Sequence, residues 1–342
     1  MTSNAVRPLR ARGSRRPRGV LLVLTALLLV VIAASLVVGP YPMSLGDLAA
    51  TLVGHGDAGS TFVVWDLRVP RLALGIVAGA ALALSGGLYQ ALLRNPLASP
   101  DIIGITGGAS VAAVYAIVVL GASGAVLSGF AFAGAVVAAL AVYALAWRDG
   151  ISGYRFALIG IAVAFVASGV LSYLMTRGNL DAVQDAVVWL AGSIGNVSWQ
   201  TVGVTAVLVA VLLPFVVAFA PRLRVLQLGD DLASGLGVRP ERVRVTLLVV
   251  GAGLAAVATA AAGPIAFIAF MSAPIARRLV RDGSLALTAT ALTGVLIVLA
   301  GDFVGQNLFG AVQVPVGVVT GAVGAPYLLW QLATTNSRGK GA

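Results

Sequence analysis

The sequence predicts an all-α polytopic protein that crosses a membrane about ten times, and three features support this class. Hydrophobic residues make up 59% of the 342 residues, charged residues only 10%, and the mean hydropathy is +1.01. Soluble domains contain about 25% charged residues, so this chain has too little charge to cover a water-exposed surface. Its apolar residues occur in runs of about 20, the length that a helix needs to cross a bilayer. The 42 glycines also suit membrane helices, which pack closely through small residues.

The basic residues that give the chain a net charge of +10 lie where such residues orient membrane helices. Six arginines precede the first apolar run, and most of the others lie in short segments between runs. This pattern is typical of topology signals and of contact with anionic headgroups, so the expected partner is a lipid membrane and not nucleic acid. The chain has no cysteine, which excludes disulfides and thiolate metal sites. We expect no metal or cofactor to be bound by this chain.

Ten apolar runs, separated by charged or Gly/Pro-containing breaks, are the predicted spans. They cover residues 20–39, 70–92, 101–120, 125–147, 156–176, 199–219, 244–262, 264–280, 285–304 and 315–333. An even number puts both ends of the chain on one side. With both ends cytoplasmic, every one of the 22 basic residues except Arg68, Arg71 and Arg177 lies inside, as the positive-inside rule favours.

These spans give the expected organisation. A basic cytoplasmic tail, 1–19, precedes a single transmembrane domain, 20–333, and a short cytoplasmic tail, 334–342, follows it. The expected location is the cytoplasmic membrane of a bacterial cell. A cleaved signal peptide is the alternative for the first run. Because Val20–Gly39 is long enough to span and no clear small-x-small cleavage site precedes Pro40, a retained helix is favoured.

Three segments between the spans are large. Two are external, 40–66 and 177–198, and the second is predicted to be an amphipathic or partly helical piece at the outer surface. The third is internal, about 220–243. It is too polar to insert and more patterned than a linker.

The sequence contains no motif for binding ATP. A P-loop requires Gly-x-x-x-x-Gly-Lys-Ser/Thr, because its lysine reaches the phosphates and its hydroxyl holds magnesium. The single lysine, Lys340, lies close to the end of the chain. The chain is therefore predicted not to be an enzyme. A transporter of this kind would need cytoplasmic ATP-binding subunits that use ATP and Mg²⁺, and the internal loop is the expected docking site.

An ion-coupled secondary transporter is the competing class. Such proteins usually carry ionisable groups near the bilayer midplane. Only Asp101 and Asp302 approach helix interiors, and both are expected to be interfacial. His55 lies in an outer loop, where a solvated histidine is favoured over a ligand. A membrane receptor or scaffold is a third class, which the absence of any soluble domain disfavours.

Four ordered motifs resemble the permeases of iron–siderophore, haem and cobalamin ABC importers. They are RVPRLALGIVAGAALALSGGLYQALLRNPLASPDIIGITGGAS at 68–110, LGDDLASGLGV at 228–238, AGPIAFIAFMSAPIARRLV at 262–280 and VPVGVVTGAVGAPYLLW at 314–330. The resemblance covers nearly the whole chain. It implies a type II importer subunit that carries ferric siderophores, or alternatively haem or cobalamin, by alternating access.

The resemblance also implies partners. These are a second permease subunit, identical or different, and an extracytoplasmic substrate-binding protein. In the family, arginines of the R-x-P-R motif dock that protein, a role that falls here on Arg68 and Arg71. Two exposed guanidiniums suit carboxylate docking, although anchoring at lipid headgroups is the alternative. The family often has another arginine where this chain has Gln306, so one docking contact is expected to be absent or supplied by a partner permease.

The family's ATPase-coupling element corresponds to Gly229–Gly237, and an ordinary capped surface helix is the alternative. The residues expected to act there are Asp230, Asp231, Leu232, Gly235, Leu236 and Gly237. The acids open the element, the leucines supply an apolar knob, and the glycines permit close approach.

Two further segments match the family's inner gate. The expected gate residues are Asn95, Pro96, Leu97, Ser152, Gly153 and Tyr154. Pro96 removes a backbone donor and disfavours helix at the preceding residue. Because non-helical backbone at membrane depth needs protein or a water-filled cavity beside it, we expect this break to face the pore. Tyr154 stands where relatives often have small hydroxyl residues, a departure that affects the shape of the gate.

Overall fold

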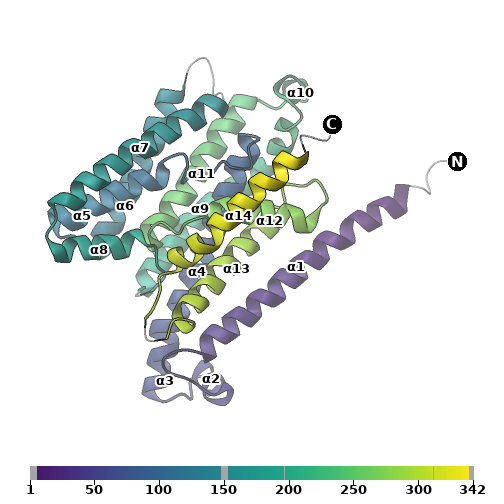
Figure 1. Ribbon diagram of the computed structural model, residues 1–342. Coiled ribbons are helices and arrows are strands. Elements are labelled where there is room, and N and C mark those ends of the chain that lie inside the picture. The colour runs from purple at the N-terminus through teal and green to yellow at the C-terminus, as the bar shows by residue number, and fades with distance from the viewer. Residues whose placement is uncertain (1–5, 148–152, 196, 311, 339–342) are drawn as a thin grey trace.

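The computed structural model describes residues 6–147, 153–195, 197–310 and 312–338 and is all-helical there (Figure 1). The long helices are α1 (Val6–Val37), α4 (Val69–Leu92), α5 (Ile105–Leu120), α6 (Gly124–Ala146), α7 (Gly153–Arg177), α9 (Trp199–Leu226), α11 (Pro240–Ala262), α12 (Ile268–Val280), α13 (Leu287–Asn307) and α14 (Val316–Arg338). The short ones are α2 (Leu45–Leu52), α3 (Ala58–Phe62), the π-helix η1 (Val63–Arg68), α8 (Leu180–Leu190) and α10 (Asp230–Gly235).

Eight helical segments in the described part of the chain are long and apolar enough to cross a membrane. They are Arg16–Val37, Ala58–Leu92, Gly124–Ala146, Gly153–Arg177, Trp199–Leu226, Pro240–Ala262, Leu287–Asn307 and Val316–Thr334. This confirms the predicted class of all-α polytopic membrane protein. The other two predicted spans fall on shorter helices, α5 with 16 residues and α12 with 13.

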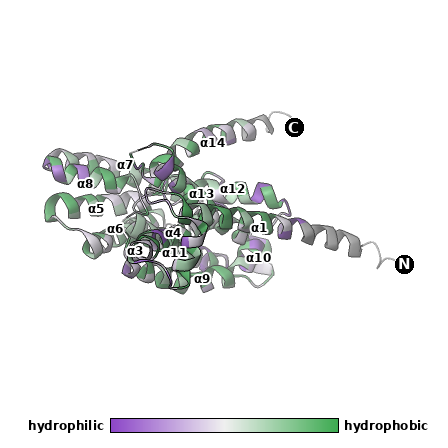
Figure 2. Cartoon of the chain, turned by 90° about the horizontal axis from the view of Figure 1, so that it is seen from below, coloured by the Kyte–Doolittle hydropathy of each residue, from purple (hydrophilic) through white to green (hydrophobic). Residues whose placement is uncertain are grey.

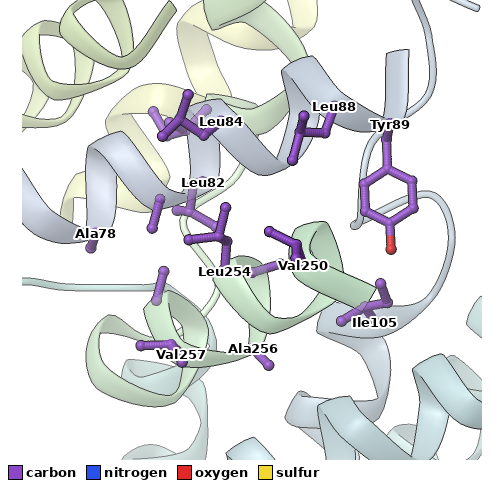
Figure 3. Packing of buried hydrophobic residues seen from close by; sticks show 14 of the residues in the cluster. Ala78, Leu82, Leu84, Leu88, Tyr89, Ile105, Val250, Leu254, Ala256 and Val257 are labelled. Carbon is purple, nitrogen blue, oxygen red and sulfur yellow. The ribbon is translucent and has the colours of Figure 1, made fainter. Parts of the chain in front are cut away.

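Helix α4 forms the centre of the bundle and packs against α9, α11, α12 and α13. Figure 3 shows its contact with α11, where Leu82, Leu88 and Tyr89 meet the apolar face that carries Val250 and Leu254. In lipid, helices gain little from hydrophobic association and depend on close packing. At this contact Tyr89 packs directly over Gly251, where a Cβ would lie 2.9 Å from the tyrosine ring.

Glycines set the distance between α4 and two neighbours. A Cβ on Gly86 would lie 1.7 Å from the carbonyl oxygen of Ala269 in α12. A Cβ on Gly79 would lie 3.0 Å from the carbonyl oxygen of Gly294 in α13, and one on Gly294 would lie 2.6 Å from that of Gly79. These helices approach backbone to backbone, which only residues without a large side chain allow.

The remaining helices surround this centre. Helices α5, α6 and α7 form a layer beside α11, with α8 against α5, while α1 lies along α13 on the other side (Figure 1). Hydrophobic residues occur along most of the helices (Figure 2). Large apolar side chains such as Phe165 on α7 and Val217 on α9 are 75% and 72% exposed. Exposed apolar surface of this extent fits contact with lipid.

Figure 1 separates two ends of the bundle. One, here called the α10 end, holds α10 and the last turns of α14. The other, here called the α3 end, holds α2 and α3. Both short helices begin with side-chain caps: Ser44 and Asp47 form a capping box at α2, and Asp57 accepts hydrogen bonds from the backbone of α3.

Several helix ends differ from the predicted boundaries. Helix α1 begins at Val6, so most of the segment predicted as a basic tail is helical. Helix α9 continues to Leu226 and α11 begins at Pro240, which narrows the non-spanning connection from 220–243 to 227–239. These helices continue past the apolar runs into arginine-containing segments, because arginine has a high helix propensity. The predicted helical piece within 177–198 is confirmed as α8.

Candidate functional site

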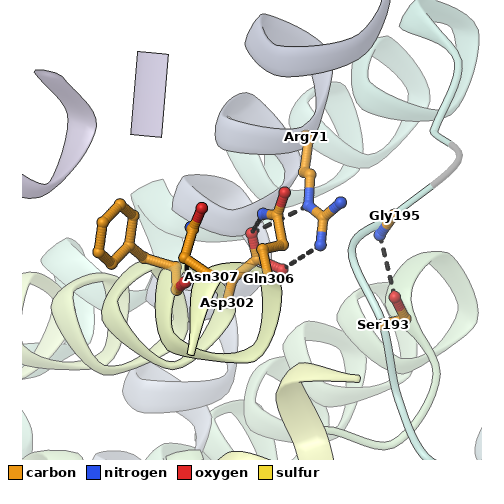
Figure 4. Close-up of polar contacts among 7 residues, drawn as sticks. Arg71, Ser193, Gly195, Asp302, Gln306 and Asn307 are labelled. Atoms are coloured by element: carbon orange, nitrogen blue, oxygen red, sulfur yellow. Dashed lines mark hydrogen bonds and ion pairs between the residues drawn. The ribbon is translucent and has the colours of Figure 1, made fainter. Parts of the chain in front are cut away.

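The first turn of α4 presents Arg71 to a carboxylate on α13 at the α3 end (Figure 4). Arg71 donates from Nε to Oδ2 of Asp302 over 2.9 Å and from Nη2 to Oδ1 over 2.7 Å. Asp302 is buried, whereas the Arg71 side chain keeps 20% of its exposure. The packing of α13 on α4 encloses Asp302 within the protein, and its expected depth near the membrane interface stays a prediction.

Gln306 lies one helical turn after Asp302 and donates its amide hydrogen to the same carboxylate. Asp302 thus accepts hydrogen bonds from both side chains, which suits an ionised carboxylate. Sequence reasoning considered Gln306 only as a replacement for an arginine and did not connect it with Asp302. Their i, i+4 spacing on one helix was the available signal.

Arg68 is engaged with the backbone of the preceding segment. Its guanidinium donates to the carbonyl oxygens of Leu36, in the last turn of α1, and of Tyr41. Carbonyls at a helix C-terminus lack partners within the helix, and an arginine side chain can satisfy them. Arg68 therefore ties the end of α1 to the start of α4. It was expected to be exposed and is half-buried.

The two arginines share a cavity of about 460 Å³ at the α3 end. Its walls also include Tyr41, Asp302 and Gln306. Arg71 lines a second cavity as well, of about 560 Å³, beside Asp185, Trp189, Ser193 and Gly195. The Ser193 hydroxyl accepts a hydrogen bond from the Gly195 N–H, which shapes the loop in front of Arg71 (Figure 4). Both predicted docking residues therefore lie together in an open recess.

Helix α10 and the two residues after it, Leu236 and Gly237, carry the predicted coupling residues at the opposite end. Asp230 and Asp231 occupy its first turn, where carboxylates interact favourably with the helix dipole. Arg244 of α11 donates to Oδ1 of Asp230 over 2.8 Å and fixes the helix to the bundle. Leu232 and Leu236 are 61% and 65% exposed. The segment presents two apolar side chains to its surroundings from an anchored helix.

The structure requires glycine at one of the two glycine positions of this segment and not at the other. Gly237 has φ +79°, a left-handed conformation that favours glycine. A Cβ on Gly235 would meet nothing within 4 Å, so the packing of this chain does not require glycine there. Close approach of another molecule would be a reason for it.

The adjacent loop between α12 and α13 contains Asp282. Hydrogen bonds from the Ser284 hydroxyl and N–H hold the pKa of this carboxyl below its usual range. The charge of Arg224, near the end of α9, acts in the same direction.

The predicted gate residues lie near the α10 end, and the structure brings two of the segments together. Asn95 Oδ1 accepts a hydrogen bond from the Leu97 N–H over 2.9 Å, which forms a tight turn after α4. Arg94 just before it has φ +49°. Gly153, at the start of α7, contacts Leu93 and shares with it a cavity of about 160 Å³.

The other predicted gate residues are placed differently. Tyr154 is 80% exposed and so does not close this small cavity. Ser152 lies outside the described residues. Asn95 and Pro96 line a larger cavity, of about 470 Å³, together with three arginines. Two of these, Arg277 and Arg278 of α12, had no role in the sequence interpretation, because nothing in the order of residues places α12 beside the end of α4.

The comparisons with known proteins agree on one family. Residues 27–334 match the family described as the FecCD transport family. The ferric enterobactin transport system permease protein FepG of Escherichia coli is 38% identical over 315 residues, which cover 90% of this chain and 95% of that protein. The achromobactin transport system permease protein CbrC of Dickeya dadantii is 40% identical over 309 residues, 90% of this chain and 88% of that one.

A solved metal-chelate type ABC transporter in an inward-facing conformation has the same fold. Its TM-score is 0.82 at 27% identity, covering 93% of this chain and 99% of that one. The resemblance predicted from the four motifs is confirmed. The relatives are permease proteins, which also confirms that this chain is a transport subunit and not an ATPase. The chain, a multi-pass protein of the cell membrane, belongs to the FecCD transport family.

Proposed function

We propose that this chain is the permease subunit of an ATP-driven ABC importer that carries ferric siderophores inward. The observation on which this rests is the family match over residues 27–334, together with relatives named for ferric enterobactin and achromobactin transport. The structure adds a recess with two arginines at one end of the bundle and an anchored helix with exposed leucines at the other.

In the proposed topology all ten long helices cross the membrane, and the α10 end faces the cytoplasm with both termini. Two observations support it. The α10 end is rich in arginine, as cytoplasmic segments are. The two short helices, α5 and α12, follow non-helical segments that lie at least partly against protein, at 98–100 and 103–104 before α5 and at 263–267 before α12. Irregular backbone is tolerated at membrane depth in such places.

The proposed partners follow from the two ends. A substrate-binding protein docks its carboxylates at Arg68 and Arg71 outside, and an ATP-binding subunit receives α10 in a groove inside. ATP and Mg²⁺ are used by that subunit. A second permease subunit completes the pathway, which opens alternately to each side as the ATPase cycles.

Uptake measurements test this function. Cells that lack this chain, and have no redundant importer, are given several iron-labelled ferric siderophores and, in parallel, labelled haem and cobalamin. The expected result is a selective loss of ferric siderophore uptake that the wild-type gene restores. Loss of haem or cobalamin uptake instead would show that the cargo is haem or cobalamin, and the chain would still be an importer subunit. Unchanged uptake of every compound would contradict the proposal.

A further inference from the structure

Three arginines converge on the larger cavity at the α10 end. The cavity has a volume of about 470 Å³ and lies between the ends of α4, α9, α12 and α14. Its lining residues are Gln90, Ala91, Arg94, Asn95, Pro96, Gln227, Pro274, Arg277, Arg278 and Gln331. None of these is acidic. The walls thus contribute three positive charges and no carboxylate.

Each guanidinium is held by an uncharged group. Arg277 donates to Oε1 of Gln90, whose amide in turn donates to the Phe270 carbonyl oxygen over 2.9 Å. Arg94 donates from Nη2 to the Leu226 carbonyl oxygen over 2.7 Å. The guanidinium carbon of Arg278 lies 4.3 Å from the centre of the Trp330 ring. These contacts orient the three groups without neutralising them.

The ion pairs found among the described residues lie elsewhere. They join Arg71 to Asp302 at the α3 end and Arg244 to Asp230 at α10. Arg277 is half-buried, and Arg94 and Arg278 are exposed. Grouped guanidiniums without a counter-ion repel one another, so an anion bound between them stabilises the cluster. Arginine is also well suited to it, because its planar fork binds carboxylate and similar oxygen pairs at two points.

A row of aromatic rings leads to this cavity. Phe267 and Phe270 of α12 are 6.1 Å apart, Phe270 and Tyr327 of α14 are 6.5 Å apart, and Tyr327 and Trp330 are 5.7 Å apart, measured between ring centres. The row ends under Arg278. Trp330 is 51% exposed, which leaves part of its face open to a ligand.

The start of the row borders a separate cavity of about 330 Å³. Phe267, Phe270 and Pro264 line it, and its one acidic lining residue is Asp101. The backbone beside it is irregular, since Phe267 has φ +65° and α12 begins only after it. The row therefore connects a cavity at the non-helical break with the arginine cavity, along two packed helices.

We propose that the arginine cavity is a cargo site at the cytoplasmic end of the pathway, and that the cargo is an anionic ferric chelate. Its iron would be held by catecholate or carboxylate oxygens and not by a neutral hydroxamate. This rests on the proposed function and narrows its substrate class. Two features favour cargo over other anions. The predicted gate residues Asn95 and Pro96 form part of the wall. The ring of Trp330, 51% exposed and beside Arg278, offers a surface on which a ring-bearing ligand can stack.

Reconstitution of the complete importer tests this. Permease, ATPase and binding protein are placed in vesicles with and without phosphatidylglycerol, and both iron uptake and ATP hydrolysis stimulated by the binding protein are measured. The chelates are a ferric tricatecholate, ferric citrate, a neutral ferric trihydroxamate and cobalamin. The variants are R94Q, R277Q and R278Q, with R277K to keep the charge at the position that contacts Gln90.

The matched control is R222Q. Arg222 lies on α9 near the same end, outside the cavity, and stacks on Phe219 at 5.0 Å, much as Arg278 stacks on Trp330. We expect the wild-type importer to carry an anionic chelate. Each cavity variant lowers that uptake about tenfold, as loss of a charge-assisted contact does, while stimulated ATP hydrolysis stays within about twofold. R277K retains most uptake, and R222Q is unchanged.

Each other outcome is decisive. An equal loss of ATP hydrolysis would show that the arginines serve the ATPase, and a loss confined to phosphatidylglycerol vesicles would assign them to lipid headgroups. Either result overturns the inference. Uptake of only the trihydroxamate or cobalamin would overturn it and leave the importer function intact. A wild-type complex that hydrolyses ATP but moves none of these compounds would overturn the proposed function itself.

Discussion

Arg71 of α4 and Asp302 of α13, 231 positions apart in the sequence, form a two-point ion pair at the α3 end of the bundle. The arginine proposed to receive a carboxylate from the binding protein is already held by a carboxylate of its own chain. Asp302 occupies Nε and Nη2, which fixes the plane of the guanidinium. A docking carboxylate would therefore meet an oriented group and not a mobile one, which lowers the entropy lost on binding.

Replacing Asp302 by Ala removes the partner of a partly enclosed guanidinium. We expect the free energy of unfolding to fall by about 1–3 kcal/mol, the cost of leaving a charged donor without its acceptor. Thermal unfolding in detergent would measure this. D302N, which keeps the shape and loses the charge, should lie between D302A and wild type. Unchanged stability in both variants would show that the pair contributes nothing to the fold.

The two arginines at the α3 end should separate by function. R71A is expected to weaken binding of the substrate-binding protein at least tenfold, because it removes a charge-assisted contact. R68A should lower stability as well as docking, because Arg68 also satisfies carbonyls at the end of α1. Surface plasmon resonance with the binding protein, beside unfolding curves, makes the comparison. Equal docking by R71A and wild type would contradict the assignment of Arg71.

Charged residues on the exposed face of α10 should uncouple transport from ATP hydrolysis. L232D combined with L236D leaves the helix anchored through Arg244 and Asp230 but removes both apolar side chains from the proposed contact. We expect a loss of at least tenfold in ATPase stimulation and in uptake, since a buried carboxylate without a partner is costly. The control is L308D, one substitution of the same kind at a 72% exposed leucine that follows α13. Equal effects of both changes would contradict a specific coupling role.

The close approach of α4 and α12 gives a packing prediction. G86A would place a methyl group 1.7 Å from the Ala269 carbonyl oxygen, so the helices must separate. Overpacking of this kind costs about 1–3 kcal/mol or more, and we expect a lower yield of folded protein in size-exclusion chromatography. At Gly203 of α9 a Cβ meets nothing within 4 Å, so G203A serves as the control. Equal yields of the two variants would disprove the requirement at Gly86.

The absence of native cysteine makes the topology directly measurable. H55C, in the loop between α2 and α3, and S234C, in α10, each introduce one thiol at an exposed position. A membrane-impermeant maleimide added to intact cells should label the first and not the second, with both labelled after lysis. Labelling of both in intact cells would contradict a span arrangement that places them on opposite sides.

Much of the fold was predictable from the sequence, because membrane spans are coded locally. A run such as Gly124–Ala146 must be helical in lipid whatever it packs against, since its backbone has no other partner. Helix ends were less predictable: α9 runs to Leu226, past the apolar stretch, because arginine permits helix outside the membrane. The motif at 228–238 could be located because it resembles a segment of the family.

The sequence alone therefore determined the class of membrane protein, the approximate helices, the family and the candidate docking and coupling segments. Only the tertiary structure decided which charges meet. The pairing of Arg71 with Asp302, and the grouping of Arg94 with Arg277 and Arg278, join helices far apart in the chain. Such contacts depend on helix rotation and spacing, which glycine-mediated packing between α4, α12 and α13 sets and which no local pattern encodes.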